Sequence, residues 1–287
     1  MKILLLLIPF LAFAVPPPEG RPPSTPFISG DTFRFFADFV YDELDTSLDP
    51  SRVTSGKTVF VKTDYLAPFF QKIHPAISSP YILITHNSDD PAPGPYARFL
   101  DDPKLLAWFG QNFDGTSHPK MHPIPIGLAN AHWPHGKCKE LKKIQKQRLS
   151  KKHLAYLNVT VQTFSEERKK LFDYFSKTSF CYKKTGRKYK EFLKDVASCQ
   201  FVISPRGNGL DTHRLWETLY LGSIPIVKSS SLDPLYQNLP ILIVQEWESV
   251  TEEFLQKKAK ELARSKFSLE SLTIQYWLER INSYKTN

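Results

Sequence analysis

The sequence is poor in cysteine and lacks the signatures of several common binding modules. Its 287 residues include three cysteines, Cys138, Cys181 and Cys199. An odd number at wide spacing excludes a disulfide framework and a zinc site of paired cysteines, although one bridge would fit an oxidising compartment. Zinc-finger, RNA-recognition and basic-zipper signatures are missing, and we therefore expect no nucleic acid among its partners.

Long apolar runs are also absent except at the N-terminus. There, Lys2 precedes the apolar run Ile3–Val15, which ends in Ala12-Phe13-Ala14. The run is shorter than the roughly 20 residues of a membrane-spanning helix and is typical of a secretory signal peptide. We interpret residues 1–26 as this segment followed by a proline-rich extended tether. The chain is then expected in the secretory pathway, in the Golgi or endoplasmic reticulum lumen if the source is eukaryotic, with membrane association through an uncleaved segment as the alternative.

The composition is that of a globular protein with excess positive charge. Hydrophobic residues make up 41% and charged residues 23%, which argues against disorder. The formal net charge is +9, which favours an anionic partner. Basic residues concentrate at 137–152 and 168–194, where either solvated helix faces or a polyanion-binding surface would explain them.

Short apolar runs alternate with amphipathic segments from residue 27 onward, a pattern typical of parallel α/β folds. We expect strands at 27–29, 58–61, 81–85, 105–109, 124–126, 154–161, 201–204, 224–227 and 239–244. We expect helices at 30–43, 67–77, 164–177, 189–197, 211–221 and 250–263.

The basic segment 136–152 separates two halves that follow the same pattern. The sequence therefore predicts an α/β protein of two Rossmann-like domains, 27–150 and 151–287, with parallel sheets facing a cleft. Ligands of such sheets bind beyond the carboxyl ends of the strands. The amphipathic segment 269–284 has apolar side chains with which it could dock back on the N-terminal domain.

A glycine-rich turn, Pro205-Arg206-Gly207-Asn208-Gly209, follows the predicted strand at 201–204. Glycines let a backbone approach a ligand closely, and the free N–H groups and dipole of a following helix favour an anion. Asp211 or Thr212 would cap that helix. Arg206 adds a forked cation suited to phosphate.

Further charged residues follow within the predicted helix. His213 and Arg214 fall in its first turn, and Glu217 lies where a carboxylate could accept hydrogen bonds from ribose hydroxyls. Packing would explain the glycines, but it does not require three cations around one turn. The pattern predicts a nucleoside diphosphate site made of Arg206, Gly207, Asn208, Gly209, Asp211, Thr212, His213, Arg214 and Glu217.

The segment FVISPRGNGLDTHRLWE at 201–217, followed by LGSIPIV at 221–227, resembles the sugar-donor-binding segment of exostosin-like glycosyltransferases. Weaker similarity to bacterial-type relatives lies in Ile28-Ser29-Gly30-Asp31 and Pro125-Ile126-Gly127-Leu128. The resemblance implies the two-domain GT-B fold, with Arg206 and the turn 208–213 on the diphosphate and Glu217 on the ribose. It implies no metal and no cofactor besides the nucleotide-sugar. Many relatives are longer than this chain.

An inverting transferase needs a base that takes a proton from the acceptor hydroxyl. The segment His86-Asn87-Ser88-Asp89-Asp90 follows a predicted strand of the N-terminal half. We rank Asp89 and His86 equally as bases and place Asp31 after them. Ordinary turn chemistry would also explain these residues, and two adjacent aspartates could bind a divalent cation.

Four histidines and a tryptophan form a second polar stretch. The spacing of His118, His122, His132 and His135 matches no zinc pattern. Trp133 could stack on a sugar acceptor.

The sequence thus predicts a glycosyltransferase that moves a hexose or pentose from a nucleoside-diphosphate sugar to a glycan or another hydroxyl acceptor, with inversion. The alternative is a non-catalytic relative that binds carbohydrate or a polyanion. A sulfotransferase fits less well, because its phosphate-binding turn would follow the first strand.

Overall fold

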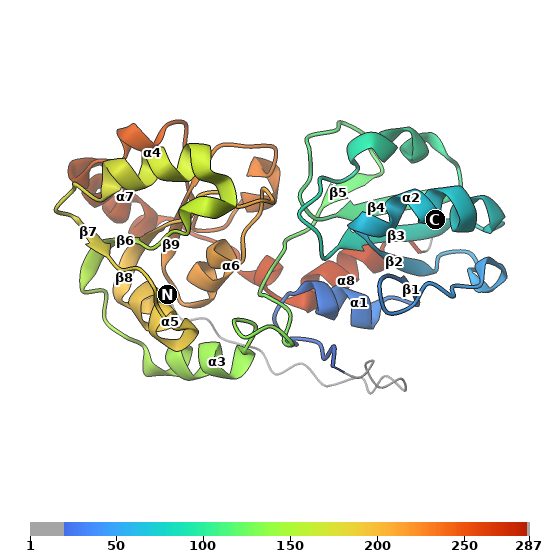
Figure 1. Ribbon diagram of the computed structural model, residues 1–287, viewed down its shortest axis with the longest axis horizontal. Coiled ribbons are helices and arrows are strands. Elements are labelled where there is room, and N and C mark those ends of the chain that lie inside the picture. Colours follow the sequence, from blue (N-terminus) through green and yellow to red (C-terminus); the bar gives the residue numbers. More distant parts are fainter. Residues whose placement is uncertain (1–19, 286–287) are drawn as a thin grey trace.

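The computed structural model describes residues 20–285 and contains two parallel β-sheets flanked by helices (Figure 1). The predicted signal segment lies outside these residues. Within the described range, no helix is long and apolar enough to cross a membrane. All three cysteines are free thiols.

The first sheet has five strands in chain order, and all neighbouring strands are parallel. They are β1 (Phe39–Tyr41), β2 (Thr58–Lys62), β3 (Tyr81–His86), β4 (Leu105–Gly110) and β5 (Met121–Pro123). Side chains alternate between the two faces, so Val59 and Val61 pack toward α2 (Leu66–Pro68) and the helical turns after it. Phe60 packs toward α1 (Gly30–Phe36) and α8 (Ile274–Asn282) on the other face.

The second sheet has the order β10-β9-β8-β6-β7, again with all neighbours parallel. Its strands are β6 (His153–Leu157), β7 (Cys181–Lys183), β8 (Cys199–Ile203), β9 (Ile224–Lys228) and β10 (Leu242–Val244). The chain reverses its direction of travel across the sheet between β6 and β8, which makes this pair a topological switch point.

Helices cover both faces of the second sheet. One face carries α4 (Ser165–Phe175) and α7 (Glu252–Arg264). The other carries α3 (Cys138–Gln147), α5 (Tyr189–Ser198) and α6 (His213–Tyr220).

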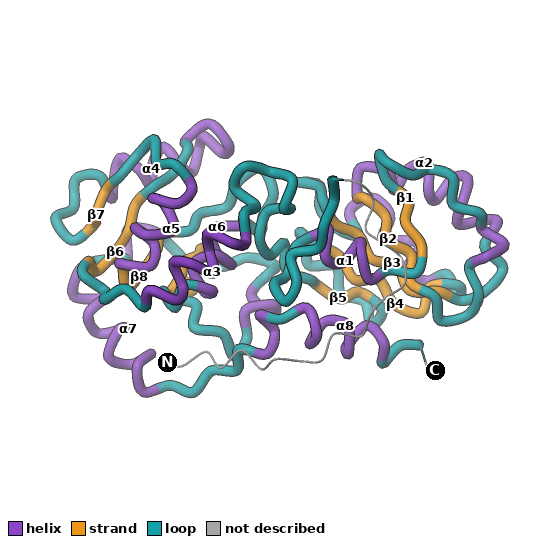
Figure 2. The backbone as a smooth tube through the Cα atoms, turned by 90° about the horizontal axis from the view of Figure 1, so that it is seen from below, coloured by secondary structure: helices purple, strands orange, loops and turns teal. Residues whose placement is uncertain are grey.

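One continuous apolar cluster joins the two halves. It contains Phe109 of the first sheet and Trp216 of α6, both fully buried. The chain also returns to its starting half, because α8 lies beside α1 (Figures 1 and 2). The Tyr220 hydroxyl donates to the Leu272 carbonyl at 2.8 Å and accepts from the Ile28 N–H at 3.2 Å, which ties α6 to both chain ends.

The segment before the first sheet differs from prediction in three ways. No strand forms at 27–29, because Ser29 instead caps α1 by accepting from the Thr32 N–H. The helix predicted to reach residue 43 ends at Phe36. Residues 39–41 instead form strand β1, which pairs with β2, and their extended backbone cannot continue the helix. Finally, Arg21 and Ser24 are buried, so residues 20–26 belong to the folded structure and not to a tether.

Other boundaries also shift. The strand predicted at 124–126 is β5, three residues earlier, because Pro125 has no N–H and the Ile126 N–H donates to Asp211. The helix predicted at 67–77 divides into short turns. The strand β7 was not predicted at all, and β6 and β10 are shorter than expected.

Candidate functional site

The loops after β6 and β8 meet at the switch point of the second sheet, where doubly wound folds bind ligands. Arg168 of α4 ties these loops together. Its guanidinium donates to the carbonyls of Arg206 at 2.7 Å, Thr160 at 2.9 Å and Pro205 at 3.3 Å. These main-chain oxygens are its only hydrogen-bond partners between residues 20 and 285, and no carboxylate pairs with it.

Arg206 extends from the glycine-rich turn and is half-buried. Its guanidinium carbon lies 4.3 Å from the ring centre of Phe164, which belongs to the loop after β6. Its Nη2 donates to the Asn208 carbonyl at 3.0 Å. Within the described chain, Arg206 also has no carboxylate partner, so its positive charge is not neutralised.

Arg214 lies in the first turn of α6. Its Nε is buried without a hydrogen-bond partner, and its guanidinium carbon lies 5.8 Å from the ring centre of Phe192. Burial, followed by repulsion from Arg214, lowers the pKa of Arg168 to about 10, and burial also lowers the pKa of Arg214. Among residues 20–285, no carboxylate forms an ion pair with any of these three arginines, although Glu217 attracts Arg214 from further along α6.

Glu217 is buried one turn further along α6. Burial raises the pKa of Glu217 to about 7, and the Tyr189 hydroxyl and Arg214 act in the opposite direction. Glu217 lines neither of the two cavities described below, so its contact with a ribose stays a prediction.

Gly209 serves the junction between the two halves. A Cβ at this position would lie 2.7 Å from Asn112 Nδ2 and 3.2 Å from Asp89 Oδ1, both in the first half. At Gly207 the nearest atom would be Arg168 Nη2 at 3.5 Å, an ordinary contact. Gly209 is therefore required because the backbone of the turn comes close to the first half of the protein. The sequence had suggested that the turn comes close to a ligand instead.

Asp211 also serves this junction. It is 3% exposed, and its carboxylate accepts from the Ile126 N–H at 2.8 Å and from Trp216 Nε1 at 2.9 Å. Burial raises the pKa of Asp211 to about 7, against the effect of these hydrogen bonds. Its side chain is committed to protein contacts and does not face a cavity.

A cavity of about 270 Å³ lies at the carboxyl ends of β8 and β9, and we call it the C-terminal cavity. Its polar lining consists of Glu167, Ser204, Arg206, Thr212, Lys228, Ser229 and Ser230. Thr212 immediately precedes α6, whose free N–H groups and dipole favour an anion. The structure thus places Arg206 and Thr212 in one polar cavity, while Asn208 is exposed beside it on the same turn.

A cavity of about 340 Å³, here called the N-terminal cavity, lies at the end of β3. Its lining includes Arg21, Glu43, Lys62, His86, Asn87, Asp89, Asn130, His132, Trp133 and His213. His213 comes from α6 and directly follows Thr212, which lines the other cavity. The start of α6 therefore touches both cavities.

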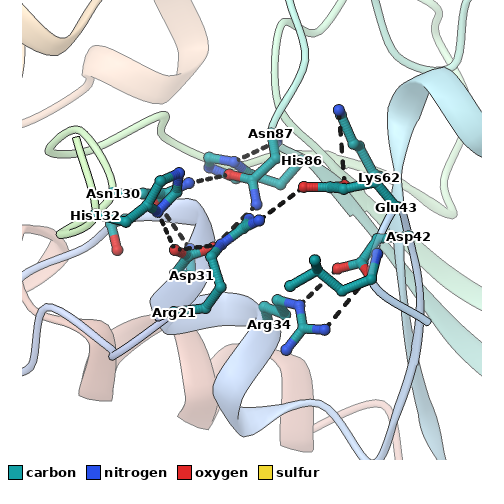
Figure 3. A network of polar contacts seen from close by, with 12 residues as sticks. Arg21, Asp31, Arg34, Asp42, Glu43, Lys62, His86, Asn87, Asn130 and His132 are labelled. Atoms are coloured by element: carbon teal, nitrogen blue, oxygen red, sulfur yellow. Dashed lines mark hydrogen bonds and ion pairs between the residues drawn. The ribbon is translucent and has the colours of Figure 1, made fainter. Parts of the chain in front are cut away.

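Asp31 organises the polar network beside the N-terminal cavity (Figure 3). It is fully buried, and Arg21 donates to it from Nε at 2.8 Å and from Nη2 at 2.7 Å. Asn87 Nδ2 and His132 Nδ1 lie 3.3 and 3.2 Å from its oxygens. With so many donors and no exposure, Asp31 cannot itself receive a proton from a substrate.

The two first-ranked base candidates differ in their surroundings. His86 is buried, its Nδ1 accepts from the Asn87 N–H at 2.7 Å, and its Nε2 donates to the Pro125 carbonyl at 3.1 Å. Burial lowers the pKa of His86 to about 4. Neither ring nitrogen is free for a substrate. Asp89 is exposed, lines the N-terminal cavity and makes no hydrogen bond with the described residues, so it stays a candidate.

Arg168, Arg21 and His132 were not singled out from the sequence as site residues. His132 contacts Asp31 across 101 positions, and no local pattern indicates such a pair. The described residues contain no group of three or more histidines, cysteines, aspartates or glutamates that could hold a metal ion.

Comparisons with known proteins do not assign a family. No family model matches the chain, and no curated protein matches it. Among solved structures, it is similar to a chain of "Crystal structure of GtfA/B complex", with 12% identity and a TM-score of 0.38. The match covers 82% of this chain and 59% of the other, so this chain spans less than two thirds of the length of that protein.

Proposed function

We propose that the chain is an inverting glycosyltransferase of the GT-B type, related to the exostosin-like enzymes, that uses a nucleoside-diphosphate sugar as donor. The observation that carries the proposal is a group of three arginines at the switch point of the second sheet, Arg168, Arg206 and Arg214, none of which forms an ion pair with a carboxylate of residues 20–285. A buried charge without a counter-ion is costly to a fold. A diphosphate in the C-terminal cavity would contact Arg206, which lines it, and would bring negative charge close to Arg168 and Arg214, which do not.

The chemistry follows from this placement. When the bond between the sugar and the diphosphate breaks, negative charge develops on the leaving phosphate. We expect Arg206 and the N–H groups at the start of α6, which adjoin the C-terminal cavity, to stabilise that charge. His213, at the start of the same helix, lines the N-terminal cavity, where an acceptor hydroxyl would bind. The secretory or membrane-associated location inferred from the N-terminus stays part of this proposal.

Thermal shift with nucleotides tests the proposal. We expect uridine or guanosine diphosphate to raise the melting temperature, because a ligand at about 100 times its Kd stabilises a fold by about 2.7 kcal/mol. The matching nucleosides, which lack phosphate, should have little effect. The proposal fails if no nucleoside diphosphate stabilises the protein more than sulfate does at equal ionic strength.

A non-catalytic polyanion-binding protein is the second candidate. It is favoured by the exposed lysines of α3, namely Lys139, Lys142, Lys143 and Lys146. Salt-sensitive heparin binding combined with no turnover of any nucleotide-sugar would support this candidate over the first.

A further inference from the structure

Three histidines line the N-terminal cavity, and they differ in what each ring touches. The ring of His86 is bound on both nitrogens, as described above. His213 Nδ1 donates to the Gly127 carbonyl at 2.9 Å, and His132 Nδ1 lies 3.2 Å from Asp31 Oδ2. Only His132 is backed by a carboxylate among the histidines of this cavity.

This contact fixes the tautomer of His132. An ionised carboxylate only accepts hydrogen bonds, so His132 Nδ1 carries a proton, and in the neutral ring Nε2 carries the lone pair. The Nε2 atom has no hydrogen-bond partner in the described part of the chain, and the side chain is 30% exposed. His132 therefore presents a free lone pair at the cavity.

The network behind Asp31 keeps this carboxylate in place (Figure 3). Arg21 donates to Asp31 through two nitrogens and to Glu43 Oε1 at 2.7 Å. The Asn130 side chain accepts from the Asp31 N–H at 2.8 Å. Asp31 is the charged group in contact with the ring of His132. The other charged residues around the cavity are Arg21, Glu43, Lys62, Asp64 and Asp89.

We infer that His132, held by Asp31, is the general base that activates the acceptor hydroxyl. This inference rests on the proposed transferase function. The acceptor oxygen attacks the anomeric carbon and forms the new C–O bond, while its proton passes to His132 Nε2. The bond from that carbon to the diphosphate breaks, and the leaving group takes the electron pair. Asp31 is a positioning residue that stabilises the imidazolium so formed.

The remaining groups of the cavity fit supporting roles. His213 contacts the Gly127 carbonyl, which cannot balance the charge of an imidazolium as the carboxylate beside His132 can. Burial also lowers the pKa of His213 to about 4. His213 Nε2 therefore acts as an acceptor of a substrate hydrogen bond. Trp133 is 53% exposed on the same loop as His132 and offers a flat face for a sugar ring. Asp89 is the rival base, but imidazole is better matched to proton transfer near neutral pH.

The test compares His132→Gln with the matched control His135→Gln, which alters an exposed histidine three positions further on the same loop. Binding of uridine and guanosine diphosphates is measured by calorimetry, and turnover by nucleotide release from UDP-glucose, UDP-N-acetylglucosamine and GDP-mannose with mixed monosaccharide acceptors. We expect His132→Gln to bind nucleotide like the wild type and to lose about 100-fold or more in turnover, and His135→Gln to keep both.

Two further measurements separate the alternatives. Asp31→Asn should move the acidic limb of the pH–rate profile to lower pH, because the imidazolium loses its counter-charge. Histidine ¹⁵N NMR of the wild type, assigned with His132→Gln, should show the Nδ1–H tautomer for His132 without any need for turnover.

Unchanged turnover in His132→Gln, a large loss in Asp89→Asn alone, or the Nε2–H tautomer of His132 would overturn the inference and leave the proposed function intact. Absence of nucleotide binding by the wild type would instead remove the proposed function, and the inference with it.

Discussion

The buried arginines of the first half and the arginines at the switch point of the second half have opposite surroundings. In the first half, Arg21 pairs with Asp31 at 2.7 Å and Arg34 with Asp42 at 2.6 Å. In the second half, Arg168 meets main-chain carbonyls, and Arg206 and Arg214 lie over aromatic rings. The first network is electrostatically complete, whereas the second has an excess of positive charge that an anion would balance.

We infer that arginines paired with carboxylates stabilise the fold and that the arginines without such a pair bind a ligand. Removing one partner of a buried ion pair leaves an uncompensated charge and is strongly destabilising. Removing a buried charge that has no partner relieves a cost. The predictions below test this contrast, beginning with the largest expected effect.

Arg21→Met should lower the free energy of unfolding by about 3–5 kcal/mol, because Asp31 stays buried without its main counter-ion. Urea denaturation measures the loss. Lys57→Met is the control, since Lys57 pairs with Asp38 but is 45% exposed, and its removal should cost under about 1 kcal/mol. Equal losses in the two variants would contradict the account of the first half.

Gly209→Ala should lower the free energy of unfolding by about 1–3 kcal/mol, because the added methyl group would collide with the Asn112 side chain. Gly207→Ala has room for its methyl group and should change stability little. Thermal denaturation of both variants shows whether Gly209 serves the junction between the halves, and a tolerated Gly209→Ala would refute that role.

Arg214→Met should weaken nucleoside diphosphate binding about tenfold or more, a change of about 1.4 kcal/mol. Without ligand, the variant should be about as stable as the wild type, because the cost of burying Arg214 exceeds its attraction to Glu217. Calorimetry and urea denaturation measure the two effects. A loss of stability as large as that of Arg21→Met would show that Arg214 is neutralised within the protein.

The pH dependence of stability is the last test of the second half. The pKa of Glu217 is about 7 in the folded protein and near 4.5 for an unperturbed side chain, so the folded state keeps a proton that the unfolded state releases. The contribution of Glu217 to stability should therefore fall as the pH rises from about 5 to about 8, whereas those of His86 and His213 rise with pH up to about 6.5.

Glu217→Gln should make the slope of stability against pH less negative, while Asp211 still contributes a fall in the same range. Urea denaturation at several pH values would show the difference. An identical slope in the two proteins would argue against a proton on Glu217.

The sequence predicted the second half better than the first because its key residues are contiguous. The turn at 205–209 and the helix after it form one local unit, and Gly222, with a φ of 67°, follows the end of that helix. The role of Gly209 was missed because its neighbour Asn112 is distant in the sequence.

The first half depends on contacts that no local pattern reveals. Arg21 lies in a proline-rich segment that gives no sign of burial, yet it neutralises Asp31. The segments 28–31 and 125–128, which weakly resemble bacterial-type relatives, lie next to each other in the fold. The Leu128 N–H donates to the Ile28 carbonyl at 2.8 Å. Spatial proximity of this kind, and with it the His132–Asp31 pair, becomes visible only in three dimensions.

Calorimetric titration of uridine and guanosine diphosphates into wild type, Arg206→Ala and the exposed control Arg264→Ala tests the central claim most directly. The account predicts that the wild type binds one of the two nucleotides, that Arg264→Ala binds it equally well and that Arg206→Ala binds it at least about tenfold more weakly. No binding by the wild type, or undiminished binding by Arg206→Ala, would contradict the claim.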